Sequence, residues 1–122
     1  ADVVSDPTPK LMLADELEAI TEPGAGARII AGMLLAARSQ PETCMMLVTH
    51  LAPAIIKASQ CDDFRVDGIE ASGLDADLEL VVDRTPKRNH LARSTPELIV
   101  KRLVERSSGH AKKLFGEILQ MF

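Results

Sequence analysis

Two short apolar runs, each followed at once by polar residues, mark the first fifty positions of the chain. Residues 11–14 lead directly into Asp15 and Glu16, and residues 44–48 lead into a polar pair that ends with His50. Continuous apolar runs of this length are typical of strands buried on both faces, as in a parallel sheet covered by helices. We therefore expect two buried strands that each deliver polar side chains at their ends.

A helix is predicted between these two runs. Residues 27–38 are dense in Ala, Ile, Leu and Met, as in a mostly buried helix, and Thr21 is a candidate N-cap before them. A strand, a helix and a second strand in this order form a parallel β-α-β unit, which crosses over right-handed. Both strands then end at one edge of the sheet, so we expect His50 to face Asp15 and Glu16.

The second half of the chain predicts a hairpin followed by two helices. After a short helix at 51–59, residues 64–69 and 78–83 flank a turn that contains Gly and Asp, which favours an antiparallel pair. Ser-Thr-Pro-Glu at 94–97 is a helix start, with Pro in the first turn and an acid at the positive end of the helix dipole. Apolar positions then recur at helical spacing, with a break at 107–109, which indicates a helical hairpin.

Length and composition indicate one globular domain. The chain has 122 residues, of which 46% are apolar, enough for one hydrophobic core. It has no apolar run long enough to cross a membrane and no secretory leader, so we expect no membrane contact and a cytoplasmic location. We expect Cys44 and Cys61 to be reduced, and neither to be catalytic.

Charge and aromatic content limit what the chain contacts by itself. The net charge is −4 and the only aromatic residues are three Phe, so a large phosphate-binding surface and a base-stacking platform are both disfavoured. Any nucleic-acid contact is expected to come mostly from residues outside this sequence.

The pair Asp15 and Glu16 at the end of a buried strand matches the Walker B element of nucleotide hydrolases. There the first carboxylate holds Mg²⁺ through its water shell and the second polarises the attacking water. The alternative is that two acids merely end a strand at a solvated edge. His50 likewise has two interpretations: a hydrogen-bonded residue that closes a strand, or a contact to the terminal phosphate that holds the water in line.

The chain resembles the ATPase domain of MutS-type proteins, and within them the MutS-related branch. The resemblance rests on Leu-Met-Leu-Ala-Asp-Glu-Leu-Glu-Ala-Ile-Thr-Glu-Pro-Gly-Ala-Gly-Ala at 11–27, on Leu-Val-Thr-His at 47–50, and on Ser-Thr-Pro-Glu-Leu-Ile-Val at 94–100. It implies that Asp15 associates with Mg²⁺ and that Glu16 is the catalytic carboxylate. By the same resemblance His50 senses the phosphate, and Thr21, a candidate cofactor-binding residue, lies in the loop that faces the partner subunit.

The chain also departs from that family pattern. Glu18 and Ile20 stand where the family usually has Gly, a residue that tolerates backbone angles which cost other residues energy. No Gly-x-x-x-x-Gly-Lys-Ser/Thr occurs, so the loop that cradles the phosphates is missing, and so is the family's interfacial signature segment. We therefore expect ATP and Mg²⁺ in a longer parent protein, and an isolated chain that is not an ATPase.

The resemblance gives the expected fold class and organisation. The fold is α/β, a partial P-loop NTPase sheet with a β-α-β unit, a β-hairpin and a C-terminal helical hairpin. Residues 1–93 are expected to be the C-terminal part of the ATPase core, and 94–122 a dimerisation element. A sheet that lacks the P-loop strand has an open edge along 44–49, so we expect a homo-oligomer unless residues 1–10 or the loop around Pro53 cover that edge.

Two other interpretations stay open. ABC-type ATPase cassettes share the Asp-Glu strand end and the downstream Thr-His, although their loop after the Glu usually ends in Leu-Asp, which is not seen here. The second interpretation is a non-catalytic assembly module that binds a partner through its helical hairpin. A P-loop with clamp-like helical domains upstream of this sequence favours the MutS interpretation, and a Gln-loop cassette favours the transporter type.

Overall fold

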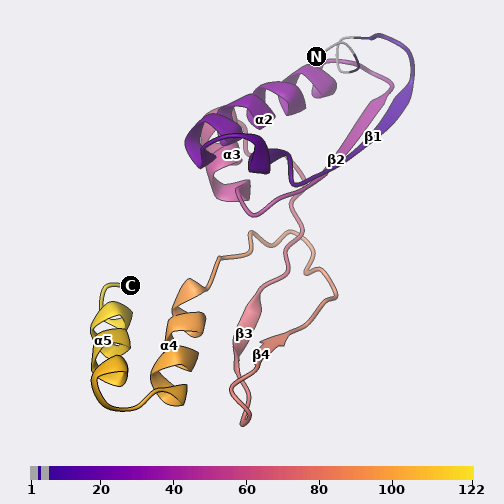
Figure 1. The fold of residues 1–122 in the computed structure, drawn as a ribbon. Coiled ribbons are helices and arrows are strands. Elements are labelled where there is room, and N and C mark those ends of the chain that lie inside the picture. Colours follow the sequence, from indigo (N-terminus) through magenta and orange to yellow (C-terminus); the bar gives the residue numbers. More distant parts are fainter. Residues whose placement is uncertain (1–2, 4–5) are drawn as a thin grey trace. The chain divides into compact units, whose positions relative to one another are not determined.

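The computed structural model describes Val3 and residues 6–122 of the chain, and the fold is α/β. The chain divides into two compact units, Ala1–Arg65 and Val66–Phe122, here called unit 1 and unit 2 (Figure 1). Within the described residues, each unit contains one two-stranded sheet and two α-helices.

Unit 1 is built on a parallel pair of strands. Strand β1 (Lys10–Asp15) pairs with β2 (Thr43–Val48), with Asp15 opposite Val48 at the end of the ladder. Helix α2 (Pro23–Arg38) connects the two strands and packs beside β2 (Figure 1). The β-α-β unit is therefore confirmed.

The two faces of this sheet differ in exposure. Met12, Ala14, Met45 and Leu47 point to the helix side and are half-buried, and Leu47 packs against the core. On the other face Leu11 is 66% exposed and Leu13 70% exposed. The prediction of burial on both faces is thus wrong for this chain, because the described helices of unit 1 supply an apolar partner for one face only.

A small apolar core lies between α2 and the short helix α3 (Ala52–Ser59). Ala27, Ala31 and other small residues on α2 allow α3 to approach closely, so Ile30 and Ile55 reach 2% and 3% exposure. The half-buried residues that pack against this core are Leu17, Leu34, Leu47 and Leu51.

The first turn of α2 is capped by Glu22. Its carboxylate accepts hydrogen bonds from the backbone N–H of Gly24, at 3.0 Å, and from that of Ala25. The prediction of Thr21 as the N-cap is therefore wrong by one residue, because Pro23 occupies the first helical position and Glu22 precedes it.

In unit 2 the hairpin pairs β3 (Ala71–Leu74) with β4 (Leu80–Val82) in antiparallel fashion. The hairpin is confirmed, but its first strand begins at Ala71 rather than at 64. Asp75 sets this register: its carboxylate accepts from the backbone N–H of Asp77 and of Glu79, both at 2.9 Å, which places the turn directly after Leu74.

Residues before β3 instead lie against the connection that follows β4. Gly68 and Lys87 form an isolated antiparallel bridge, with N···O distances of 3.0 and 2.8 Å. Helix α4 (Pro96–Arg106) and helix α5 (Gly109–Leu119) then pack on each other as the predicted helical hairpin (Figure 1).

The structure groups the β-hairpin with this helical pair, and unit 1 ends at Arg65. The functional division at residue 93 stays a prediction. Among the described residues, the longest apolar helical stretch falls short of what crossing a membrane requires.

Candidate functional site

Glu16 and His50 lie at one pocket beyond the carboxyl ends of β1 and β2. The pocket has a volume of about 230 Å³, and its lining consists of Glu16, Glu18, Ala19, Pro23, His50 and Leu51. The parallel register explains this meeting, since β1 and β2 end side by side and each chain turns away at the same edge.

Glu16 begins a sharp turn out of β1. Its backbone is left-handed, with φ 51° and ψ 34°, and it leads into the single 3₁₀ turn η1 (Leu17–Ile20). A residue with a Cβ pays about 1–2 kcal/mol for this conformation, and backbone strain of this kind tends to occur at functional sites. This turn directs the chain away from the line of β1 at the point where Glu16 lines the pocket.

Asp15 and Thr21 do not line the pocket that Glu16 and His50 share. Asp15 is exposed at the last position of β1, on the same open face as Leu11 and Leu13, and Thr21 is exposed before α2. The structure therefore brings together two of the four predicted site residues.

Glu18 is the carboxylate that the structure adds to this site. Its side chain is only 6% exposed, whereas that of His50 is 74% exposed. Oε1 of Glu18 accepts hydrogen bonds from the Thr49 hydroxyl at 2.7 Å and from the His50 backbone N–H at 3.1 Å. Nδ1 of the His50 ring lies 2.9 Å from the same oxygen.

The pKa of Glu18 is lowered although burial opposes its charge. Desolvation is the largest single effect and raises the pKa; the hydrogen bonds from Thr49 and the backbone, together with the positive charge available on His50, lower it by more. The carboxylate is therefore ionised at neutral pH.

Sequence reasoning missed this role of Glu18. A Glu in a loop is exposed by default, and its only visible signal was that it replaces a family Gly. The side chain of Ile20, the other departure, lies outside the described part of the structure.

The carboxylates at this edge of the sheet could bind Mg²⁺ together with water molecules, but they do not form a complete metal site. Asp15 and Glu16 offer the oxygen ligands that Mg²⁺ prefers, and Mg²⁺ usually keeps several waters beside one or two carboxylates. In the part of the chain that the structure describes, no group of three or more His, Cys, Asp or Glu side chains converges as a metal site. A metal here would thus need further ligands from nucleotide or water.

A second pocket lies at the far end of α2, lined in part by Arg38, Asp63 and Phe64. Arg38 forms a two-pronged ion pair with Asp63, and its guanidinium lies 5.8 Å from the centre of the Phe64 ring. A hydrogen bond from the Cys61 thiol and the pairing with Arg38 lower the pKa of Asp63. These contacts tie the end of unit 1 to α2 and explain why Cys61 is half-buried.

The sequence is similar to that of a known DNA-binding protein. Over 113 residues, or 93% of the chain, the sequence is 46% identical to the DNA-binding protein MutS2 of Pyrococcus furiosus. The resemblance of this chain to MutS-type proteins is confirmed. The match spans 20% of that relative, so this MutS-like segment covers about a fifth of the relative's length.

Two other comparisons give no match. No protein-family model matches the MutS-like segment, and no solved structure matches it. The similarity to MutS2 is therefore the finding on which a functional proposal for the Glu16–His50 pocket can build.

Proposed function

We propose that this chain supplies the Walker B carboxylates and the phosphate-contacting histidine of a MutS-type ATPase. The observation that carries the proposal is the shared pocket of Glu16 and His50 at the ends of two parallel strands. The 46% identity to MutS2 over 93% of the chain supports it, because it confirms the MutS-type resemblance from which the roles of these residues are taken.

Each residue has a distinct part in the proposed reaction. Glu16 takes a proton from the attacking water as general base, and His50 holds the water and the terminal phosphate in line. Asp15 would hold Mg²⁺ through water, and the ion would supply positive charge to the phosphates. Thr21 is proposed to contact nucleotide from a neighbouring subunit.

The chain alone is proposed to be inactive. It lacks a P-loop, so nothing cradles the triphosphate, and its carboxylates repel the phosphates. We propose that a longer parent protein supplies the P-loop strand and contacts DNA mostly through other domains.

We also propose that the chain self-associates. Within the described residues β2 pairs only with β1, and Cys44 on this strand is exposed. The alternative that residues 1–10 cover the edge falls partly outside the described residues. The exposed apolar side chains Leu114 and Phe122 near the C-terminus offer a second surface.

The test uses Glu16→Gln in the parent protein. We expect ATP binding to persist and turnover to fall by a factor of about 10² or more, because the general base is lost while Asp15, the residue assigned to Mg²⁺, is unchanged. Measured kcat and ATP affinity decide it. Glu42→Gln, an exposed change just before β2, is the matched control and should leave kcat unchanged. Wild-type turnover in Glu16→Gln would contradict the role given to Glu16.

A further inference from the structure

Glu18 and His50 form a carboxylate–imidazole pair in which the two side chains differ in burial. The carboxylate is buried and held by Thr49 and by the backbone, whereas the ring is mostly exposed. The buried partner is therefore the fixed one. The imidazole is the group whose orientation this contact can set.

Only one edge of the imidazole faces Glu18. Nδ1 lies 2.9 Å from Oε1, and within the described chain no residue bonds Nε2. The second oxygen of Glu18, Oε2, is buried and accepts no hydrogen bond from the described residues, so the contacts of this carboxylate with Thr49 and His50 all run through Oε1.

We propose that Glu18 is a positioning residue, which holds the His50 imidazole by Nδ1, fixes the Nδ1–H tautomer of the neutral ring, and leaves Nε2 for the reacting phosphate and water. The proposal rests on the ATPase function proposed above. In a neutral imidazole one nitrogen donates and the other accepts, and the partner of one nitrogen decides the state of the other.

This assignment sets what Nε2 can do in the pocket. With the proton on Nδ1, Nε2 of the neutral ring accepts a hydrogen bond from the attacking water. When the ring carries a second proton, Nε2 donates to a phosphate oxygen. Without Glu18, the exposed ring rotates freely and both functions lose their fixed direction.

A purely structural role for Glu18 is the competing explanation. Glu18 links η1 to the end of β2 through Thr49 and the His50 backbone, and this link alone would explain its burial. The tautomer of the His50 ring separates the two, because a structural link through Thr49 leaves the ring free to adopt its ordinary state.

The chain carries its own controls for this measurement. Its three histidines are His50, His90 and His110. His90 also lies beside a carboxylate, but it is the other ring nitrogen that is close: Nε2 of His90 lies 3.0 Å from Oε1 of Glu70. His110 is exposed on α5 and forms no ion pair within the described residues, so it reports the ordinary aqueous state, in which Nε2–H is favoured.

The test is two-bond ¹H–¹⁵N correlation NMR of the histidine rings in the 122-residue chain, recorded at about pH 9, where an ordinary imidazole is neutral. We expect an Nδ1–H ring for His50 and Nε2–H rings for His90 and His110. Glu18→Ala should return His50 to Nε2–H, and Glu70→Ala should leave His50 unchanged. An Nε2–H ring for His50 in the wild-type chain would overturn the proposal, even where Glu18→Ala fails to fold.

Thr49→Val provides the second variant. This change removes the hydroxyl that donates a hydrogen bond to Glu18 but keeps the carboxylate beside Nδ1. The His50 ring should therefore keep the Nδ1–H tautomer. Loss of that tautomer in Thr49→Val would assign the effect to the structural link and would refute the positioning role.

The final step separates this proposal from the ATPase proposal. In the parent protein Glu18→Ala should lower kcat at least about ten-fold with little change in KM for ATP, whereas Glu42→Ala should change neither. Wild-type kcat in Glu18→Ala overturns the positioning role while Glu16→Gln remains inactive. Wild-type kcat in both variants instead overturns the proposed function, and the tautomer result still stands by itself.

Discussion

Unit 1 has a buried apolar core, whereas in unit 2 polar contacts tie the β-hairpin to α4 and to the connection that follows β4. In unit 1 the buried residues Ala27, Ile30, Ala31 and Ile55 form one cluster between two helices. In unit 2 neither α4 nor α5 contains a buried residue, and every residue of β4 is exposed. The two halves of one short chain thus use different physical means to hold their elements in place.

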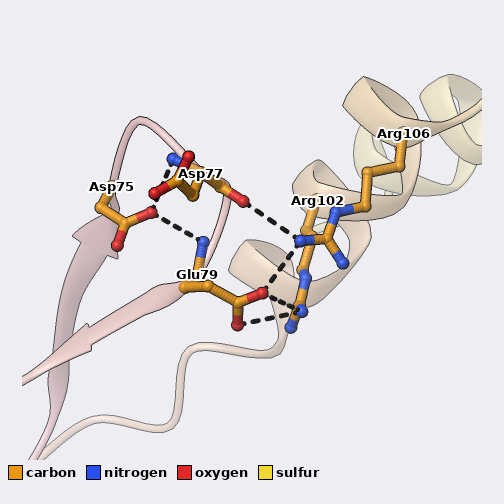
Figure 2. Close-up of polar contacts among 5 residues, drawn as sticks. All are labelled: Asp75, Asp77, Glu79, Arg102 and Arg106. Atoms are coloured by element: carbon orange, nitrogen blue, oxygen red, sulfur yellow. Dashed lines mark hydrogen bonds and ion pairs between the residues drawn. The ribbon is translucent and has the colours of Figure 1, made fainter.

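Polar contacts in unit 2 join segments that are far apart in sequence. Figure 2 shows one cluster, in which Arg102 and Arg106 of α4 both reach Glu79 at the base of the hairpin turn, at 2.8 and 2.9 Å. A second cluster forms around Glu70, which accepts from the Arg93 backbone N–H at 2.9 Å and faces His90. Residues 66–122 contain nine acidic and nine basic side chains, so such partners are abundant.

This difference bears on where precise chemistry can be placed. Apolar burial is worth about 25 cal/mol per Å² and does not weaken with salt, whereas an exposed ion pair contributes at most about 1 kcal/mol and is screened. The pocket of Glu16, Glu18 and His50 lies in the unit with the apolar core. We therefore expect unit 2 to open locally at lower free energy than unit 1.

The largest effect should come from Ile30→Ala. Ile30 is 2% exposed at the centre of the unit 1 core, and truncation to Ala leaves a cavity that costs about 2–5 kcal/mol. Amide hydrogen exchange should quicken throughout unit 1 and remain nearly unchanged in unit 2. Ile29→Ala, on the exposed side of α2, is the matched control and should cost far less. Equal effects of the two changes would contradict the core assignment.

Gly68→Ala is the corresponding test of unit 2. A Cβ on Gly68 would lie 2.6 Å from the His90 carbonyl oxygen and 2.8 Å from the Ala92 backbone nitrogen, so the backbone must shift. We expect a loss of about 1–3 kcal/mol, with faster exchange of the amides at Lys87 and His90. Gly73→Ala, where the added Cβ meets nothing within 4 Å, is the control. Wild-type exchange in Gly68→Ala would mean that the connection does not pack on Gly68.

Periodicity in the sequence was enough to predict most elements of both units. The β-α-β order, α3, and the two C-terminal helices follow from local patterns, and the pocket shared by Glu16 and His50 follows from the parallel register. These features depend on the spacing of apolar residues over short stretches, or on the general rule that a strand, a helix and a second strand form a parallel pair.

Features that depend on distant partners escaped prediction. Leu11 and Leu13 have the pattern of buried strand residues, and whether a layer covers them is decided by other segments. The burial of Glu18 depends on Thr49 and His50, some thirty positions later in the chain. The first strand of the hairpin was misplaced because Asp75, through its side chain, fixes where the turn begins.

Acid pH should weaken unit 1 through Glu18. Its folded-state pKa lies below the ordinary value of 4.5, so its stabilising contribution is complete above that value and is lost as pH falls through the folded-state pKa. Glu18→Gln should remove this part of the acid dependence, at a cost of about 1 kcal/mol near neutral pH. Urea unfolding of unit 1 amides at pH 7 and below pH 4 measures both. An unchanged acid dependence in Glu18→Gln would show that the carboxylate is not ionised in the folded state.

The smallest effect should come from Glu79→Gln, which removes the charge that Arg102 and Arg106 share. The carboxylate is 55% exposed, so the two ion pairs together should be worth about 0.2–1 kcal/mol, and high salt should erase most of that difference. Exchange of the amides in β4 and α4, measured at low salt and in about 1 M NaCl, tests this, since the Debye length falls to roughly 3 Å there. Asp83→Asn, which neutralises an exposed carboxylate just after β4 and keeps the oxygen that accepts from the Thr85 backbone N–H, should have no such salt-dependent effect on α4. Arg106 also donates to the Asp77 carbonyl oxygen at 3.1 Å, a contact that Glu79→Gln leaves in place (Figure 2). A loss that persists in high salt would therefore mean that Glu79 acts through packing of the turn rather than through its charge.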